Sequence, residues 1–252
     1  MPIPIRETYP TDRDDLLVQV TDDGSRTLVC SGTADSFHSG CGAKAETQRV
    51  YLENTGLADR LQLGHQSDVL EVGLGTSMAM LMAMDLAVTH SAPMRYVALE
   101  RDWISAQTLG FLNPSSWVQQ TWIVESYLSF RESIPRDAPD GSYTWQVDQD
   151  RIARIEVGDA LEWQPSVPVS FDAILFDPFC AESAPQFWTK QCLVKMRRWI
   201  ADHGKIATYS CSRAVRDAFE QAGWNVQRVP GPPGGKREVL VGEPKLDSAI
   251  SS

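Results

Sequence analysis

Two glycines, Gly73 and Gly75, follow the mostly apolar segment 69–72, which contains Glu71. This order predicts a buried strand that ends in a tight turn, where the backbone closely approaches a ligand. A dinucleotide loop would carry a third glycine and direct its amides at a pyrophosphate. A carboxylate beside the turn repels phosphate but suits a ligand with a cationic amino group and a sulfonium. The turn, with Thr76, therefore favours binding of S-adenosylmethionine over NAD.

Three further acids follow predicted strands: Glu100, Asp159 and Asp177. Ligands bind beyond the carboxyl ends of the strands in open α/β sheets. There, Glu100 could accept both ribose hydroxyls of a nucleoside, and Asp159 could accept from an adenine amino group. Each acid could instead cap the helix that follows it. Together with Glu71, however, the acids favour an adenosyl cofactor.

The motif Asp177-Pro-Phe-Cys180 is the sharpest local signal in the chain. An acid, a proline and an aromatic residue after a buried strand are typical of enzymes that methylate an amine. The attacking nitrogen needs a free lone pair, so an ammonium group must first lose its proton. Asp177 could orient that nitrogen or accept its proton, directly or through water. An ordinary turn between strand and loop is the alternative interpretation.

Further side chains could form the acceptor site. Aromatic rings could stack on a nucleobase, a tyrosine hydroxyl could line the pocket, and adjacent cations could bind phosphate. A histidine in a glycine-rich turn could form a pocket wall. Core packing and solvated surface charges are the alternatives for each of them. These candidates are His38, Phe179, Trp188, Tyr209, Lys236 and Arg237.

The net charge of −10 disfavours a nucleic-acid partner, but the charges are unevenly distributed. Residues 1–185 hold 12 Lys and Arg against 27 Asp and Glu, whereas residues 186–240 hold 10 against 4. The C-terminal third could therefore present a local surface for a polyanion. Helix solvation alone would also explain this distribution.

Other classes of protein are disfavoured by composition. The longest apolar run, 78–88, contains Asp85 and is shorter than the roughly 20 residues that span a bilayer. The N-terminus has no apolar signal core, so we expect a cytoplasmic protein. The five cysteines form no Cys-x-x-Cys pair, which disfavours a metal site or disulfides.

The hydrophobic pattern predicts an α/β fold with a doubly wound, mostly parallel sheet, closed by a C-terminal antiparallel β-hairpin. We expect an N-terminal extension over residues 1–60, a main domain over 61–243 with an irregular insertion at about 113–157, and a disordered tail over 244–252. The expected strands are 16–20, 27–30, 68–72, 95–99, 144–147, 154–157, 171–176, 205–209, 224–229 and 238–241. The expected helices are 40–57, 77–89, 104–112, 187–200 and 214–222.

These motifs resemble the methyltransferase domain of MnmC-type tRNA 5-methylaminomethyl-2-thiouridine methyltransferases, from about Thr27 to Gly242. The matching pieces are His38–Ala43 with Glu46, Val50–Leu52, Leu70–Thr76, Leu99–Glu100, Gly158–Leu161, Phe171–Asp177, Pro185–Trp188, Ala207–Ser210, Val215–Arg216, Ala222–Trp224 and Lys236–Leu240.

The resemblance implies methyl transfer from S-adenosylmethionine to the exocyclic amine of an aminomethyl group on a wobble uridine of tRNA. By similarity, Asp177 faces that amine, while Glu71, Gly73, Gly75, Glu100 and Asp159 hold the cofactor. Several relatives also carry a FAD-dependent oxidase domain. We expect this chain to lack the oxidase step, so that a separate enzyme supplies the aminomethyl precursor.

Three rival functions stay open. The chain departs from the family pattern at Pro178, Ala181 and Ala184, which motivates a protein or a small-molecule amine as the acceptor. A catalytically silent module that binds RNA or protein is a rival of another class, although the retained acids speak against it. A dinucleotide oxidoreductase is the third rival, which Glu71 and the missing third glycine disfavour.

Overall fold

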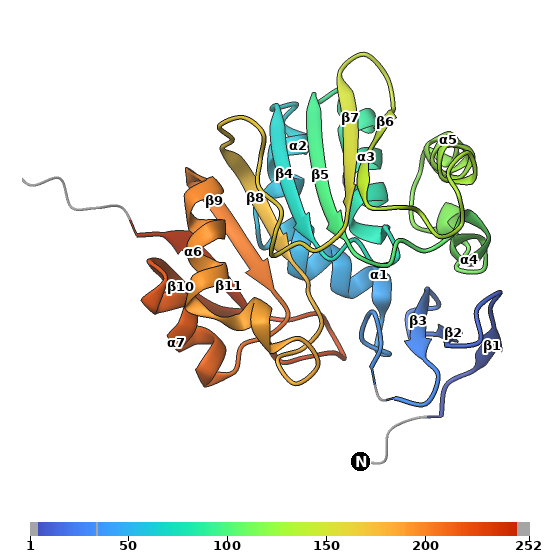
Figure 1. The fold of residues 1–252 in the computed structure, drawn as a ribbon, viewed down its shortest axis with the longest axis horizontal. Helices are drawn as coiled ribbons and strands as arrows, with labels where there is room; N and C mark the ends of the chain where they lie inside the picture. The colour runs from blue at the N-terminus through green and yellow to red at the C-terminus, as the bar shows by residue number, and fades with distance from the viewer. Residues whose placement is uncertain (1–4, 34, 246–252) are drawn as a thin grey trace, which may run out of the picture.

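The computed structural model describes residues 5–33 and 35–245, and it centres on one eight-stranded sheet (Figure 1). The strand order is β10-β11-β9-β8-β4-β5-β7-β6. The five strands from β9 to β7 pair in parallel, whereas β6, β10 and β11 pair antiparallel with their neighbours. The predicted mostly parallel sheet and its C-terminal antiparallel hairpin are therefore confirmed. The strands are β4 (Ser67–Val72), β5 (Met94–Glu100), β6 (Gly141–Gln146), β7 (Arg151–Val157), β8 (Phe171–Phe176), β9 (Ile200–Thr208), β10 (Trp224–Pro230) and β11 (Glu238–Pro244).

The central strands are apolar because both faces of the sheet are covered. Along β4, Val69 contributes to one hydrophobic cluster, while Leu70 and Val72 contribute to the other. Ala173 and Ile174 of β8 divide in the same way. This alternation gives the sheet a packed hydrophobic layer on each face. It also determines which side chains near the strand ends point to which face.

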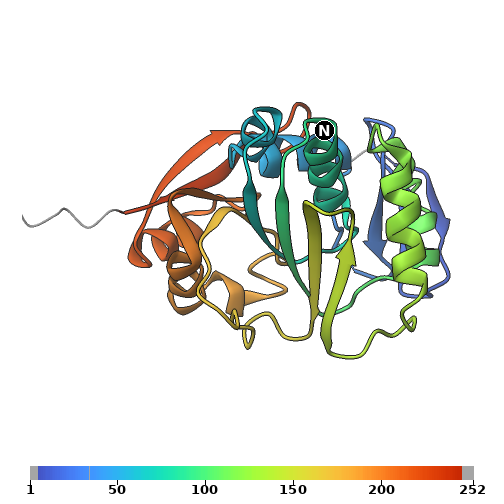
Figure 2. The ribbon, with the colours of Figure 1, turned by 90° about the horizontal axis from the view of Figure 1, so that it is seen from above.

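Helices on both faces complete the layers (Figure 2). The first face packs against η1, a π-helical segment, and against α2 and α3, whose side chains are mostly buried. The second face packs against α6 and α7. The helices are α1 (Ala43–Glu46), η1 (Thr47–Glu53), α2 (Leu57–Gln62), α3 (Met78–Thr89), α4 (Ala106–Gly110), η2 (Pro114–Ser116), α5 (Thr121–Glu132), η3 (Pro185–Trp188), α6 (Lys190–Trp199) and α7 (Arg213–Gln221).

A small antiparallel sheet of β1 (Thr8–Pro10), β2 (Leu16–Val20) and β3 (Arg26–Cys30) precedes the main sheet. The predicted strand pair and its turn are confirmed: Gly24 adopts a φ of 80°, and β2 pairs with β3. Strand β1 was not expected, because its three residues carry no alternating pattern. This sheet lies on the side of the molecule that carries α4 and α5 (Figure 1).

Two parts of the expected insertion are wrong. Residues 121–132 form the regular helix α5 rather than an irregular loop, and its apolar side is formed by Ile123, Val124 and Tyr127. Moreover, β7 pairs in parallel with β5 and is therefore a strand of the main parallel sheet. Only β6, which pairs antiparallel with β7, is added to that sheet by the insertion. Prolines at 114 and 135 indicated an irregular segment, although Ile123, Val124 and Tyr127 have helical spacing.

Smaller differences arise at element ends. The expected helix 40–57 is formed by α1 and η1, and Gly56, with a left-handed φ of 76°, separates it from α2, which was not expected. Helix α6 begins at Lys190, since Thr189 caps it by accepting from the N–H of Cys192. Strand β11 continues through Pro244, and residues 246–252 of the expected tail lie outside the described residues. None of the described helices is both long and apolar enough to cross a membrane.

Candidate functional site

Several of the predicted site residues, namely Glu71, Gly73, Glu100 and Asp177, lie at the carboxyl ends of the parallel strands. The register aligns Val72 of β4 with Leu99 of β5 and Phe176 of β8, so that the residues after them, Gly73, Glu100 and Asp177, lie in one row. Backbone hydrogen bonds of 2.9 Å continue across this row, from Gly73 to Leu99, from Asp177 to Val72 and from Gly158 to Glu100. The sequence therefore correctly predicted which strand ends come together.

The glycine turn is too crowded for side chains. Gly73 has a φ of 90°, and a Cβ there would lie 2.5 Å from the carbonyl oxygen of Asp177. Gly75 has a φ of 51°, and a Cβ there would lie 3.1 Å from the ring of Phe37. Both glycines are required, because the turn passes between the end of β8 and the segment that follows β3.

The place of a third glycine is taken by Ser77, whose φ of 62° is also left-handed. Its buried hydroxyl lies 2.8 Å from the Tyr127 hydroxyl, which in turn accepts from Nε1 of Trp103. These contacts from α5 stabilise the strained backbone. They also connect the glycine turn to the loop that follows β5.

Glu71 lies directly beneath the turn and is only 3% exposed. Its carboxyl accepts a hydrogen bond of 2.9 Å from the Tyr96 hydroxyl. Burial raises the pKa of Glu71 well above its usual range, and the charges of Asp177 and Glu100 raise it further. A cationic ligand at the turn would favour the ionised form of this carboxyl. Its chemistry therefore fits a sulfonium and an amino group.

Glu100 connects the glycine turn after β4 to the loop after β5. One carboxylate oxygen accepts from the N–H of Gly75 at 2.8 Å, and the other accepts from the N–H groups of Arg101 and Asp102, also at 2.8 Å. Burial raises the pKa of Glu100, and these three N–H groups oppose that effect. The oxygen that accepts only from Gly75 retains lone-pair capacity for a further donor such as a ribose hydroxyl.

Two other predicted cofactor residues differ in environment. Thr76 is 1% exposed, and its hydroxyl has no hydrogen-bond partner among the described residues. An orphaned hydroxyl beside a glycine turn is a place where a bound ligand can supply the missing partner. Asp159 is exposed, and its carboxylate accepts from the N–H of Leu161 at 2.9 Å. Its observed contact is therefore that of a turn cap.

Asp177 faces a cluster of polar groups from distant segments, namely Glu46, Tyr51, Tyr209 and Lys236. Burial raises the pKa of Asp177 well above its usual range. A hydrogen bond from Tyr51 lowers that pKa, the charge of Glu46 raises it, and the charge of Lys236 lowers it. The Nζ of Lys236 lies 4.2 Å from the centre of the Tyr209 ring. A partly buried carboxyl with a raised pKa is suited to accept a proton from an amine.

Of the two aromatic candidates on this segment, Trp188 is buried and Phe179 is exposed. Trp188 is buried, and its Nε1 donates to the carbonyl of Phe179 at 2.9 Å. It packs edge-on against Phe176 and Tyr209, which agrees with the core alternative. Phe179 is 45% exposed and meets Phe37 edge-to-face at 5.7 Å. Of these rings, Phe179 is the exposed one.

His38 and Arg237 lie at the edges of the cluster. The Nδ1 of His38 lies 2.9 Å from the Thr27 hydroxyl, and burial lowers the pKa of His38 to about 4. His38 is therefore neutral near pH 7 and holds the turn that follows β3. Arg237 is exposed beside Lys236 on the loop between β10 and β11.

Glu46 and Tyr51 belong to the site but were not predicted as site residues. They are five positions apart, and in an α-helix such residues point in different directions. The π-helical segment η1 bonds each residue to one five positions away, which brings them to the same side. Both residues occur in the motifs that resemble the MnmC-type domain, and this was the available signal.

The structure contains no competing metal centre within residues 5–33 and 35–245, where no cluster of three potential ligands is found. All five cysteines are free thiols. A polar surface hollow of about 460 Å³ is lined by Asp202, His203 and Glu243, among others. It lies at the start of β9, away from the glycine turn.

Comparison with known proteins agrees with this geometry. A family described as S-adenosyl-L-methionine-dependent methyltransferase matches residues 129–245. This match spans somewhat less than half of the chain, and together with the similar proteins described below it supports a methyltransferase that depends on S-adenosylmethionine. The methyltransferase therefore uses S-adenosylmethionine, the cofactor that the acid and the glycine turn favour, and the buried carboxyl of Glu71 and the orphaned hydroxyl of Thr76 fit such a ligand.

Similar proteins carry more specific names. The methyltransferase is 31% identical over 228 residues to the tRNA 5-methylaminomethyl-2-thiouridine biosynthesis bifunctional protein MnmC of Burkholderia multivorans, covering 88% of this chain and 34% of that protein. The protein of the same name from Stutzerimonas stutzeri is 27% identical over 224 residues, with 85% and 33% covered. The chain thus spans about a third of the length of these relatives.

A solved structure shows the same fold. The crystal structure of MNMC2 from Aquifex aeolicus superposes with a TM-score of 0.72 at 19% identity, covering 95% of this chain and 73% of that one. Spermidine synthase from Thermotoga maritima superposes with a TM-score of 0.50 at 11% identity, covering 95% and 72%. At these sequence identities, both similarities show a shared fold only.

Proposed function

We propose that this methyltransferase methylates the exocyclic amine of an aminomethyl group on a modified wobble uridine of tRNA. The observation that carries the proposal is the placement of Asp177, a partly buried acid that follows β8 directly beside the glycine turn. The names of the relatives support the choice of acceptor. A separate enzyme then supplies the aminomethyl precursor, and the reaction takes place in the cytoplasm.

The cofactor is held along the carboxyl ends of β4, β5 and β7. Gly73 and Gly75 give it access to the backbone, while Glu71 balances its positive charge. The remaining contacts come from Thr76 through its hydroxyl, Glu100 through the ribose hydroxyls and Asp159 at the adenine. When bound, S-adenosylmethionine supplies an electrophilic methyl group.

Asp177 prepares the attacking nitrogen. An aminomethyl group arrives largely as an ammonium ion, which has no lone pair for attack. The raised pKa of Asp177 brings its basicity closer to that of the amine, so the carboxylate accepts the proton more readily. The charge of Lys236 lowers the pKa of Asp177 and so favours the ionised carboxylate. Positioning and desolvation of the neutral amine then account for most of the rate.

The acceptor is bound by the groups around this acid. Phe179 presents an exposed ring to a base, while Trp188 and Tyr209 support its loop from below. Lys236 and Arg237 neutralise phosphates, and His38 forms part of the wall. The main domain of residues 61–243 carries the chemistry, and the segment before it supplies Glu46 and Tyr51.

Methyl transfer by the purified chain tests the proposal, with labelled S-adenosylmethionine and tRNA that bears the aminomethyl wobble uridine. We expect Asp177→Asn to lower kcat by at least about 100-fold, a typical general-base contribution, with little change in cofactor affinity. Asp202→Asn, on an exposed acid of β9, is the control. Full activity of Asp177→Asn would remove the assigned role. Transfer to a protein or small amine but not to tRNA would support the alternative acceptor.

A further inference from the structure

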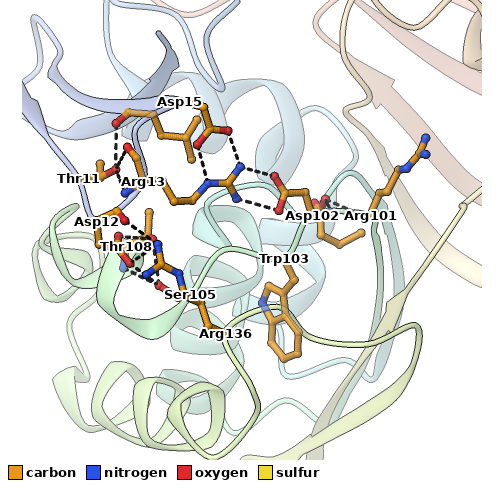
Figure 3. Close-up of polar contacts among 12 residues, drawn as sticks. Thr11, Asp12, Arg13, Asp15, Arg101, Asp102, Trp103, Ser105, Thr108 and Arg136 are labelled. Carbon is orange, nitrogen blue, oxygen red and sulfur yellow. Dashed lines mark hydrogen bonds and ion pairs between the residues drawn. The ribbon is translucent and has the colours of Figure 1, made fainter.

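The turn between β1 and β2 forms hydrogen bonds and ion pairs with the loop that follows β5 (Figure 3). Arg13 donates from Nη1 to one carboxylate oxygen of Asp102 at 2.8 Å, and its Nη2 lies 2.8 Å from the other. The same guanidinium also bonds Asp15 at 2.9 and 2.6 Å. Arg13 is thus shared between its own turn and a loop 89 residues away.

A second contact lies beside the first. Asp12 accepts from the hydroxyls of Thr108 at 2.6 Å and Ser105 at 3.2 Å, and it pairs with Arg136 at 3.2 Å (Figure 3). Ser105 is the N-cap of α4. The hydroxyl of Thr11 bonds backbone groups within its own turn, so the two charged side chains extend from a preformed support.

The loop that follows β5 also forms hydrogen bonds with the carboxylate of Glu100. The N–H groups of Arg101 and Asp102 both donate to one oxygen of Glu100. The position of Asp102 is therefore one of the restraints on the orientation of that carboxylate, beside the N–H groups of Arg101 and Gly75. Further along, the buried guanidinium of Arg131 binds the carbonyls of Trp103 and Ile104 and fixes that part of the loop from the side of α5. The part left for Arg13 to fix is the turn at residues 101–102.

We propose that Arg13 is a positioning residue for the cofactor, which acts through Asp102 on Glu100. The proposal rests on the proposed role of Glu100 at the ribose. A fork of two hydrogen bonds fixes both the distance and the plane of the Asp102 carboxylate, which a single contact would not do. The N-terminal sheet thereby contributes to cofactor affinity without touching the cofactor.

Calorimetric titration with S-adenosylhomocysteine tests the proposal on the full chain. The pair is partly exposed, so we expect Arg13→Ala and Asp102→Asn each to raise Kd by about threefold to tenfold. The double variant should bind no more weakly than either single variant, because both changes break one connection. In turnover, the KM for S-adenosylmethionine should rise while kcat and the KM for the acceptor stay near those of the wild type.

Arg26→Ala is the matched control. Arg26 also extends from the small sheet, but it donates to the carbonyl of Phe111 and does not contact residues 101–105. Its removal should leave Kd unchanged. Wild-type affinity in both Arg13→Ala and Asp102→Asn, or an equal loss in Arg26→Ala, would overturn the inference.

Glu100→Gln separates this inference from the proposed function. If Glu100→Gln weakens binding and Arg13→Ala does not, the positioning role is wrong while the cofactor site stands. If Glu100→Gln and Arg13→Ala both bind like the wild type, the assigned role of Glu100 fails together with the inference. Since Asp102→Asn breaks the pair from the other side, a folding defect of Arg13→Ala would not prevent the test.

Discussion

The carbonyl oxygen of Asp177 occupies the space in which a side chain at Gly73 would begin, 2.5 Å from the ideal Cβ position. The acid that we assign to the chemistry and the turn that we assign to the cofactor are thus in backbone contact. We expect Gly73→Ala to lower the free energy of unfolding by about 2 kcal/mol or more, since it adds a clash to an unfavourable positive φ. It should also abolish cofactor binding. Urea denaturation and calorimetric titration measure the two effects.

Gly56→Ala is the control for backbone strain alone. Gly56 has a φ of 76°, but no atom lies within 4 Å of its Cβ position. Its replacement should cost about 1 kcal/mol and preserve cofactor binding. Similar losses in both variants would show that Asp177 does not crowd the turn.

Thr76 offers a change that should stabilise the free protein. Its buried hydroxyl lacks a partner among the described residues, so Thr76→Val removes an uncompensated polar group. We expect the unfolding free energy of the free protein to rise by about 1 kcal/mol. Affinity for S-adenosylhomocysteine should fall, because the ligand would lose a hydrogen bond. An unchanged Kd would place this hydroxyl outside the cofactor site.

The pH dependence of turnover should report on Asp177. The active form is the carboxylate, so the rate falls as the pH drops through its pKa in the folded protein. Burial raises this pKa, and the acid limb should therefore lie at higher pH than for an ordinary aspartate. Lys236 lowers the pKa, so Lys236→Met should move the limb to still higher pH. Arg237→Met serves as the comparison, and an unshifted limb in Lys236→Met would contradict the assignment.

The parts of the fold and site that could be predicted from the sequence are those that depend on local residue patterns. Glu71 and Glu100 lie at the carboxyl ends of apolar strands and Gly73 follows the first of them. Because these ends must meet in a parallel sheet, the sequence sufficed to predict that the three residues come together. Helix α5 was missed because the prolines on either side of it indicated an irregular segment, although Ile123, Val124 and Tyr127 have helical spacing. The placement of Glu46 and Tyr51 around Asp177 depends on a π-helical segment, which the sequence pattern does not predict.

The neighbourhood of the acids was the least predictable part. The sequence left stacking and core packing equally open for Trp188, and its burial against Phe176 follows from the tertiary packing. Likewise, the pairing of Arg13 with Asp102 joins residues far apart in the chain, and charged residues of this kind are common on any surface. Such contacts depend on how the elements assemble rather than on local pattern.

The basic loop between β10 and β11 should contribute to tRNA affinity through charge. Replacing both Lys236 and Arg237 by alanine should weaken binding at low salt and reduce the slope of log K against log salt by about 1 to 2, as expected for two phosphate contacts. Lys205→Ala, whose lysine pairs with Glu243 at 3.0 Å, is the control. An unchanged slope in the double variant would exclude these cations from the RNA interface.

Mass spectrometry of wobble nucleosides tests the central claim most directly. The tRNA would come from cells with the wild-type chain, with Asp177→Asn, or without the chain. Our account predicts methylaminomethyl uridines with the wild type and their unmethylated aminomethyl precursors in the other two samples. The same methylated nucleosides in all three samples, with no accumulation of the precursor, would contradict the account.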